Sequence, residues 1–171
     1  MGKLFIFIFL LLVPVTLLST EEIKCFEEKD NQDSTLKHVT VTFKGQKYTR
    51  TIKNETKFVS CEVKVAGENS FVFYRFEKKF TVIKKTQNAH ILHVFAFDKN
   101  ELKLTYEQIM KTWDEAALEP QKEEFSVILK EIDKTSVLEI ENLKDPTDII
   151  IKYFYDKQLV RFKRKSKYTG N

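Results

Sequence analysis

The sequence predicts a mainly β protein: an antiparallel sandwich or barrel of about ten short strands, with one helix near residues 105–119. β-branched and aromatic residues dominate the apolar set, including 15 Phe in 171 residues, and such residues favour strands. From Leu36 onward, short alternating segments recur at intervals of about ten residues. With only 4 Gly and 3 Pro, the chain has little room for linkers or low-complexity segments.

Residues 1–20 have the features of a cleaved secretory signal peptide. Lys3 precedes an apolar run over residues 4–18, and small residues then lead into Glu21 and Glu22. The run is shorter than the roughly 20 apolar residues of a spanning helix, although an uncleaved anchor is the alternative. We therefore expect residues 21–171 to form a single secreted β-rich domain with no transmembrane segment after cleavage. A division into two subdomains near residue 100 is the alternative organisation.

Cys25 and Cys61 are the 2 cysteines of the chain. In an oxidising compartment an isolated pair normally closes as a disulfide, whereas a zinc site would need more ligands. We expect a Cys25–Cys61 disulfide that ties the mature N-terminus to a strand. Two buried free thiols are the alternative.

Asn54 begins an Asn-Glu-Thr triplet between two expected strands. Such a triplet on a surface turn accepts an N-linked glycan in the eukaryotic secretory pathway. We therefore expect Asn54 to be a glycosylation site.

The alternating pattern defines the expected strands and turns. Lys44 to Lys47 is expected to form a two-residue hairpin with Gly45 at the first central position. Residues 90–97 are apolar on both faces, which indicates a central strand covered on both sides. The expected strands are residues 38–43, 48–52, 59–65, 71–76, 80–83, 90–97, 125–129, 137–140, 149–155 and 159–162.

One segment departs from this alternation. Thr105 and Gln108 have the spacing of a capping box, Ile109, Trp113 and Ala116 follow at helical spacing, and a Glu-Pro pair ends the segment. The pattern predicts a helix that packs on a sheet through a buried Trp113. An α+β fold, with a sheet wrapped around this helix, is the alternative.

The sequence contains few side chains of the kinds that bind metals or act in catalysis. Only His38, His90 and His93 supply imidazoles, and two residues three apart on a strand point to opposite faces, so His90 and His93 make a poor metal chelate. No nucleophile elbow or glycine-rich phosphate loop is present. We expect neither an enzyme nor a bound metal or cofactor.

The C-terminus is basic. Residues 163–171 form a basic tail that continues the last strand. Alternation places Arg161, Lys163, Lys165 and Lys167 on one face and Phe162 with Arg164 on the other, where Phe162 can anchor the strand in the core. This pattern predicts a surface that binds an acidic glycan, an anionic lipid or an acidic protein, with a solvated terminus as the alternative. A secreted chain is not expected to bind nucleic acid. The expected polyanion-binding residues are Arg161, Lys163, Arg164, Lys165 and Lys167.

Together these features predict a secreted, non-enzymatic binding protein that acts through an exposed β surface, helped by the basic C-terminal patch. The aromatic clusters around residues 71–97 and 153–162 indicate a Phe-rich core. They also fit a β-barrel cavity, which gives the alternative function of an extracellular carrier of a small apolar ligand.

Overall fold

The computed structural model describes residues 23–82, 85–120, 122–144 and 150–164, and the expected signal peptide lies outside them. Two sheets make up this described part, which contains no helix. The seven-stranded sheet has the order β1-β2-β3-β7-β6-β5-β4, and the four-stranded sheet has the order β11-β10-β9-β8. The strands are β1 Lys24–Lys29, β2 Leu36–Phe43, β3 Gln46–Lys53, β4 Thr56–Ala66, β5 Asn69–Val82, β6 Lys85–Asp98, β7 Glu101–Asp114, β8 Phe125–Ile132, β9 Thr135–Asn142, β10 Ile150–Asp156 and β11 Arg161–Arg164.

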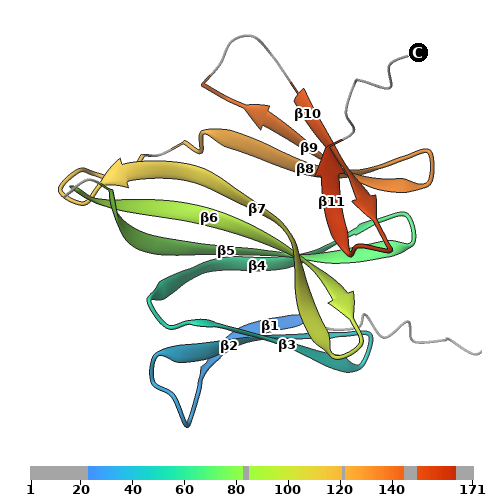
Figure 1. Cartoon of the computed structure of the whole chain (residues 1–171), viewed down its shortest axis with the longest axis horizontal. Coiled ribbons are helices and arrows are strands. Elements are labelled where there is room, and N and C mark those ends of the chain that lie inside the picture. The colour runs from blue at the N-terminus through green and yellow to red at the C-terminus, as the bar shows by residue number, and fades with distance from the viewer. Residues whose placement is uncertain (1–22, 83–84, 121, 145–149, 165–171) are drawn as a thin grey trace, which may run out of the picture.

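The seven-stranded sheet is rolled until its two edge strands meet. In Figure 1, β1–β3 lie below β4–β7, and the four-stranded sheet lies above them. The edge strands β1 and β4 contact each other and are joined by a disulfide. On the opposite side of the roll, β3 and β7 share little backbone pairing, because they run parallel and pair only at Thr49 and Glu101. This rolled antiparallel architecture confirms the predicted sandwich or barrel of short strands.

Two apolar cores lie on the two faces of the central strands. The interior of the rolled sheet contains Val72 and Tyr74, while Phe71 and Phe73 point to the other core, which the four-stranded sheet covers. Alternation along β5 thus supplies both cores. Strand β6 lies between β5 and β7, which confirms that residues 90–97 belong to a central, doubly covered strand.

The predicted helix near residues 105–119 is wrong, and so is the alternative of a sheet wrapped around it. Residues 101–114 form strand β7, and residues 115–120 contain no helix. Thr105 and Met110 are extra residues on β7, because its pairing with β6 skips each of them. Such bulges interrupt the two-residue period, and here they leave apolar spacings that resemble a helical face. The Thr105 hydroxyl caps no helix and donates instead to the Val94 carbonyl over 2.7 Å.

Trp113 is half-buried on β7 and joins no helix to a sheet, contrary to the prediction. Its ring meets the His90 ring edge to face, with 5.2 Å between centroids. Lys111 Nζ lies 5.8 Å from the centroid of the same ring. Trp113 therefore packs against side chains of its own sheet.

The hairpin between β2 and β3 is confirmed, with one correction. Phe43 pairs with Gln46, so the two central residues are Lys44 and Gly45, and glycine occupies the second position. Both residues have positive φ, 51° and 71°, as a type I′ turn requires. Lys44 therefore occupies a left-handed conformation that costs a non-glycine residue energy.

Candidate functional site

The predicted disulfide is confirmed. Cys25 on β1 and Cys61 on β4 are bonded, with their Cα atoms 6.1 Å apart and a sequence separation of 36. The bond connects the two edges of the rolled sheet. A disulfide is consistent with an oxidising, extracellular compartment.

A polar network lies beside the disulfide at the same seam. Lys37 Nζ on β2 donates to Glu27 Oε2 on β1 and to the Thr56 carbonyl on β4, over 2.7 Å in each case. The Tyr74 hydroxyl donates to the other oxygen of Glu27. Burial raises the pKa of Tyr74, and the hydrogen bond and negative charge of Glu27 raise it further. The network satisfies buried polar groups, so its function is structural.

The described part of the predicted polyanion-binding patch is strand β11. Arg161 and Arg164 are exposed, and Phe162 between them is 7% exposed and packs in the core between the sheets. The predicted anchoring by Phe162 is therefore confirmed. Lys163 Nζ lies 3.0 Å from Asp156 Oδ2, and the hydrogen bond from Lys163 is the main cause of the lowered pKa of Asp156. Lys165 and Lys167 lie outside the described residues.

Farther across the outer face of the four-stranded sheet, the charges are balanced. Glu139 on β9 lies between two lysines: Lys130 Nζ at 2.5 Å and Lys152 Nζ at 3.2 Å. Those two hydrogen bonds lower the pKa of Glu139 against the effect of burial, and the Lys130 bond contributes most. This area therefore offers an acidic ligand less positive charge than β11 does.

Asn54 is exposed in the turn between β3 and β4. Its side-chain nitrogen donates to the Ser34 carbonyl over 2.9 Å, and its backbone N–H donates to the Thr35 carbonyl over 2.7 Å. The triplet is thus on the surface turn that the sequence indicates. Its glycosylation stays a prediction.

The histidines His90 and His93 lie on opposite faces of β6. His93 contacts Phe76 of the rolled-sheet interior, with 4.7 Å between ring centroids, and its Nε2 lies 2.6 Å from Glu107 Oε2. His90 contacts Trp113 on the other face. Within the described ranges, no group of three or more His, Cys, Asp or Glu residues is arranged to hold a metal ion.

His38 on β2 belongs to a polar cluster that the sequence analysis missed. Its two ring nitrogens contact Asp30 and Thr51, at 2.8 Å and 3.1 Å. The predicted hairpin does not reveal it, because a turn with Gly45 and Gln46 at its centre pairs His38 with Lys53, whereas the observed turn at Lys44 and Gly45 places His38 opposite Thr51. Asp30 lies in the loop after β1, whose path no sequence pattern specifies.

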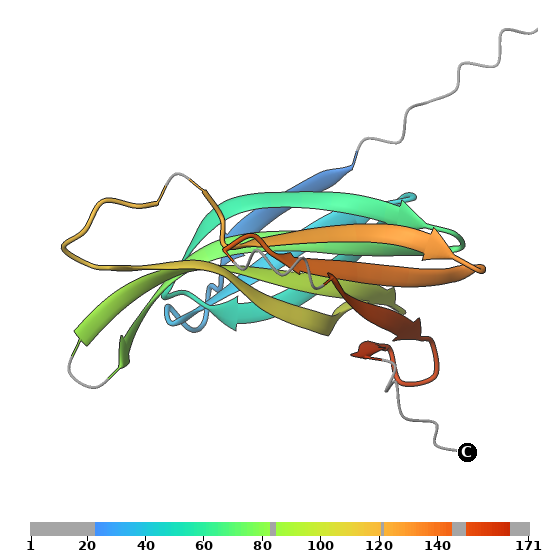
Figure 2. The same ribbon diagram turned by 90° about the horizontal axis from the view of Figure 1, so that it is seen from above.

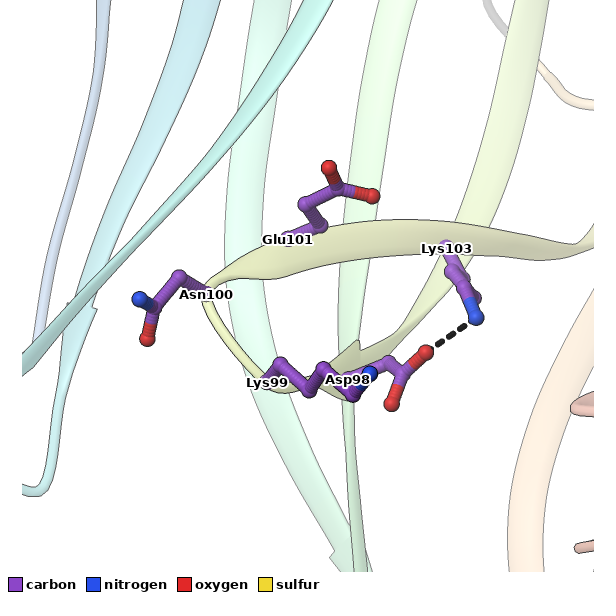
Figure 3. A pocket seen from close by; sticks show the side chains of 5 residues that line it. All are labelled: Asp98, Lys99, Asn100, Glu101 and Lys103. Atoms are coloured by element: carbon purple, nitrogen blue, oxygen red, sulfur yellow. Dashed lines mark ion pairs between the residues drawn. The ribbon is translucent and has the colours of Figure 1, made fainter.

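Several shallow hollows lie at the turns and seams. The hollow at the β6–β7 turn has a volume of about 270 Å³. Figure 3 shows that Asp98 and Lys103 meet there as an ion pair, while Asn100 and Glu101 extend away from it. Two others lie on either side of the β2–β3 hairpin: one of about 530 Å³ beside His38 and one of about 230 Å³ beside Thr51. The hollow at the β6–β7 turn lacks the convergent groups of a binding or catalytic site.

Comparison with known proteins gives no relative: no family model, no curated protein and no solved structure matches this chain. Among the residues that the structure describes, no helix is long and apolar enough to cross a membrane. The geometry and charge of the chain itself therefore carry the functional argument.

Proposed function

We propose that this chain is a secreted binding protein that holds an acidic polysaccharide on the basic edge strand β11. The proposal rests on the side chains of β11, which include two exposed arginines and a buried phenylalanine. Arg161 and Arg164 are exposed at the two ends of β11, an edge strand of its sheet, and have no carboxylate within ion-pair distance among the described residues. Because they are three positions apart, they project from opposite faces of the strand, and a ligand that crosses this edge can contact both. Unpaired guanidinium groups form charge-assisted, two-pronged hydrogen bonds with sulfate and carboxylate groups.

The rigidity of β11 supports this proposal. The Phe162 ring packs against Phe71 and Tyr155, with ring centroids 5.1 Å and 5.2 Å apart. The strand also pairs with β10 along its whole length. A cationic strand that is already ordered loses less conformational entropy on binding than a free tail does.

The packing of the interior favours a surface site over the alternative of an apolar-ligand carrier. Val39, Val41, Val72, Tyr74 and Phe95 fill the inside of the rolled sheet, each with 0% of its surface exposed. The Tyr74 ring lies against Phe76 and Phe95, with centroids 5.5 Å and 6.2 Å apart. These side chains occupy the space that a carrier would give to its ligand.

Titration calorimetry with a heparin-derived oligosaccharide tests the proposal on the full secreted chain. We expect saturable binding that weakens steeply as salt rises above about 0.1 M, because screening shortens the reach of the surface charges. A neutral dextran of the same length should give no binding. The absence of heparin binding at low salt would contradict the proposal.

A further inference from the structure

Two side chains on the outer surface of the β2–β3 hairpin and one from the loop after β1 form a chain of hydrogen bonds. Asp30 Oδ2 lies 2.8 Å from Nε2 of His38, and Nδ1 of His38 lies 3.1 Å from the Thr51 hydroxyl. Sheet register fixes the second contact, because His38 and Thr51 are direct cross-strand partners. The order carboxylate, imidazole, hydroxyl is the order of a nucleophile–base–carboxylate triad, which is recognised by geometry rather than by sequence position.

Asp30 is held in place as the acidic end of this chain. Its Oδ1 accepts the backbone N–H groups of Gln32 and Asp33, over 2.7 Å and 2.9 Å. These bonds, that of Asp33 first, lower the pKa of Asp30, and His38 lowers it further. An ionised carboxylate at Nε2 favours the imidazole tautomer that carries its proton there. Nδ1 of His38 then presents a lone pair to the Thr51 hydroxyl.

We propose that Thr51 is an activated hydroxyl nucleophile that accepts acyl groups from small esters, with His38 as its general base and Asp30 as the residue that positions His38. This activity goes beyond the proposed polysaccharide binding and departs from the expectation that the chain is not an enzyme. It uses a different surface, since strands β2 and β3 belong to the rolled sheet and β11 belongs to the other sheet.

The surroundings of Thr51 provide a place for the ester. Thr51 is exposed and lines the hollow of about 230 Å³ together with Thr49, Arg50, Glu101 and Leu102. Strand β3 pairs with β7 only at Thr49, so its edge at Thr51 is open.

The reaction balances without any further cofactor. The Thr51 oxygen attacks the ester carbonyl while its proton passes to Nδ1 of His38, and the new carbon–oxygen bond forms a tetrahedral intermediate. The bond to the leaving alcohol then breaks, and the alcohol takes the proton from His38. Water hydrolyses the acyl-Thr51 by the same steps, with His38 again accepting and returning one proton.

A fluorophosphonate probe tests the nucleophile directly in the full secreted chain. Attack by Thr51 forms an oxygen–phosphorus bond and releases fluoride, and peptide mass spectrometry locates the adduct. We expect the adduct at Thr51 in the unmodified chain and in Thr51→Ser. We expect Thr51→Val and His38→Gln to reduce the labelling rate about 100-fold or more, the contribution typical of a general base.

Thr81→Val is the matched control, because Thr81 is an exposed strand threonine of the same sheet but lies on β5, away from the hollow beside Thr51. It should label at the rate of the unmodified chain, and thermal melts should show which variants fold. An unmodified chain without an adduct at Thr51 overturns the proposal, whatever the stability of the variants. Equal labelling of folded Thr51→Val or folded His38→Gln overturns it as well.

Discussion

Cys25 and Cys61 connect the first and last strands of the seven-stranded sheet, β1 and β4, and so close the roll covalently. Figure 2 shows from a second direction how β1 lies alongside β4. Because the bond closes a loop over a sequence separation of 36 residues, its removal should cost about 3–4 kcal/mol in the chain-entropy account. Urea unfolding of Cys25→Ser/Cys61→Ser against the oxidised chain measures this difference. An unchanged midpoint would show that the polar network alone holds the seam.

That polar network gives a second prediction. Lys37 is 4% exposed, and Glu27 provides its carboxylate partner. Glu27→Ala leaves a buried ammonium group without an anion, so it should lower the free energy of unfolding by about 3–5 kcal/mol. Glu62→Ala is the control, because its partner Lys64 is solvent-accessible and such a pair contributes about 1 kcal/mol or less. Equal losses in the two variants would contradict the structural role of Glu27.

A substitution in the turn between β2 and β3 should stabilise the protein. Lys44 has a φ of 51° without being glycine, and asparagine tolerates this conformation better. Lys44→Asn should therefore raise the free energy of unfolding by about 0.5–1 kcal/mol. Gly45→Ala should lower it by about 1 kcal/mol through backbone strain alone, since a Cβ at Gly45 would meet no atom within 4 Å. A stabilising Gly45→Ala would show that the turn is of another type.

His93 makes stability depend on pH. Burial lowers the pKa of His93, Glu107 opposes this effect, and the charges of Arg50 and Lys78 lower it further. The unfolded chain, whose histidine pKa is near 6.5, therefore binds a proton more readily than the folded chain. Stability from this group is fully present above that pKa and is lost as pH falls below it.

We expect a lower urea midpoint at about pH 5.5 than at about pH 7.5. His93→Gln should reduce this difference, because glutamine can still hydrogen-bond to Glu107 but does not titrate. His90, whose pKa is also lowered by burial and then by Lys111, should account for part of the remainder. A His93→Gln variant with an undiminished pH dependence would contradict the role given to His93.

Alternation predicted most of the fold correctly, because strands buried on one or both faces display their period directly. Residues 90–97 were identified as a central strand on this basis, and Phe162 as an anchor of the last strand. The prediction failed at β7, where the bulges at Thr105 and Met110 shift the side chains between faces. A bulge arises from pairing with a neighbouring strand, and the sequence of one strand does not contain that information.

In the candidate sites too, some contacts could be predicted from the sequence and others could not. The disulfide between Cys25 and Cys61 could be predicted, because two cysteines in an oxidising compartment have only one possible pairing. The contact between His38 and Thr51 depends on the hairpin register, and the predicted turn, with Gly45 at its first central position, would have paired His38 with Lys53 instead. Asp30 reaches His38 through a loop, and loop paths depend on contacts such as those of its carboxylate with Gln32 and Asp33. Such contacts become evident only in three dimensions.

The most direct test of the proposed binding function compares elution from immobilised heparin. Arg161→Glu/Arg164→Glu reverses the two cations of β11 that have no ion-pair partner among the described residues, whereas Lys163 is already paired with Asp156. Lys47→Glu/Lys53→Glu makes the same change in net charge at exposed positions of β3. We predict that the β11 variant elutes at clearly lower salt than both the unmodified chain and the β3 variant. Elution of the β11 variant together with either of them would contradict the account.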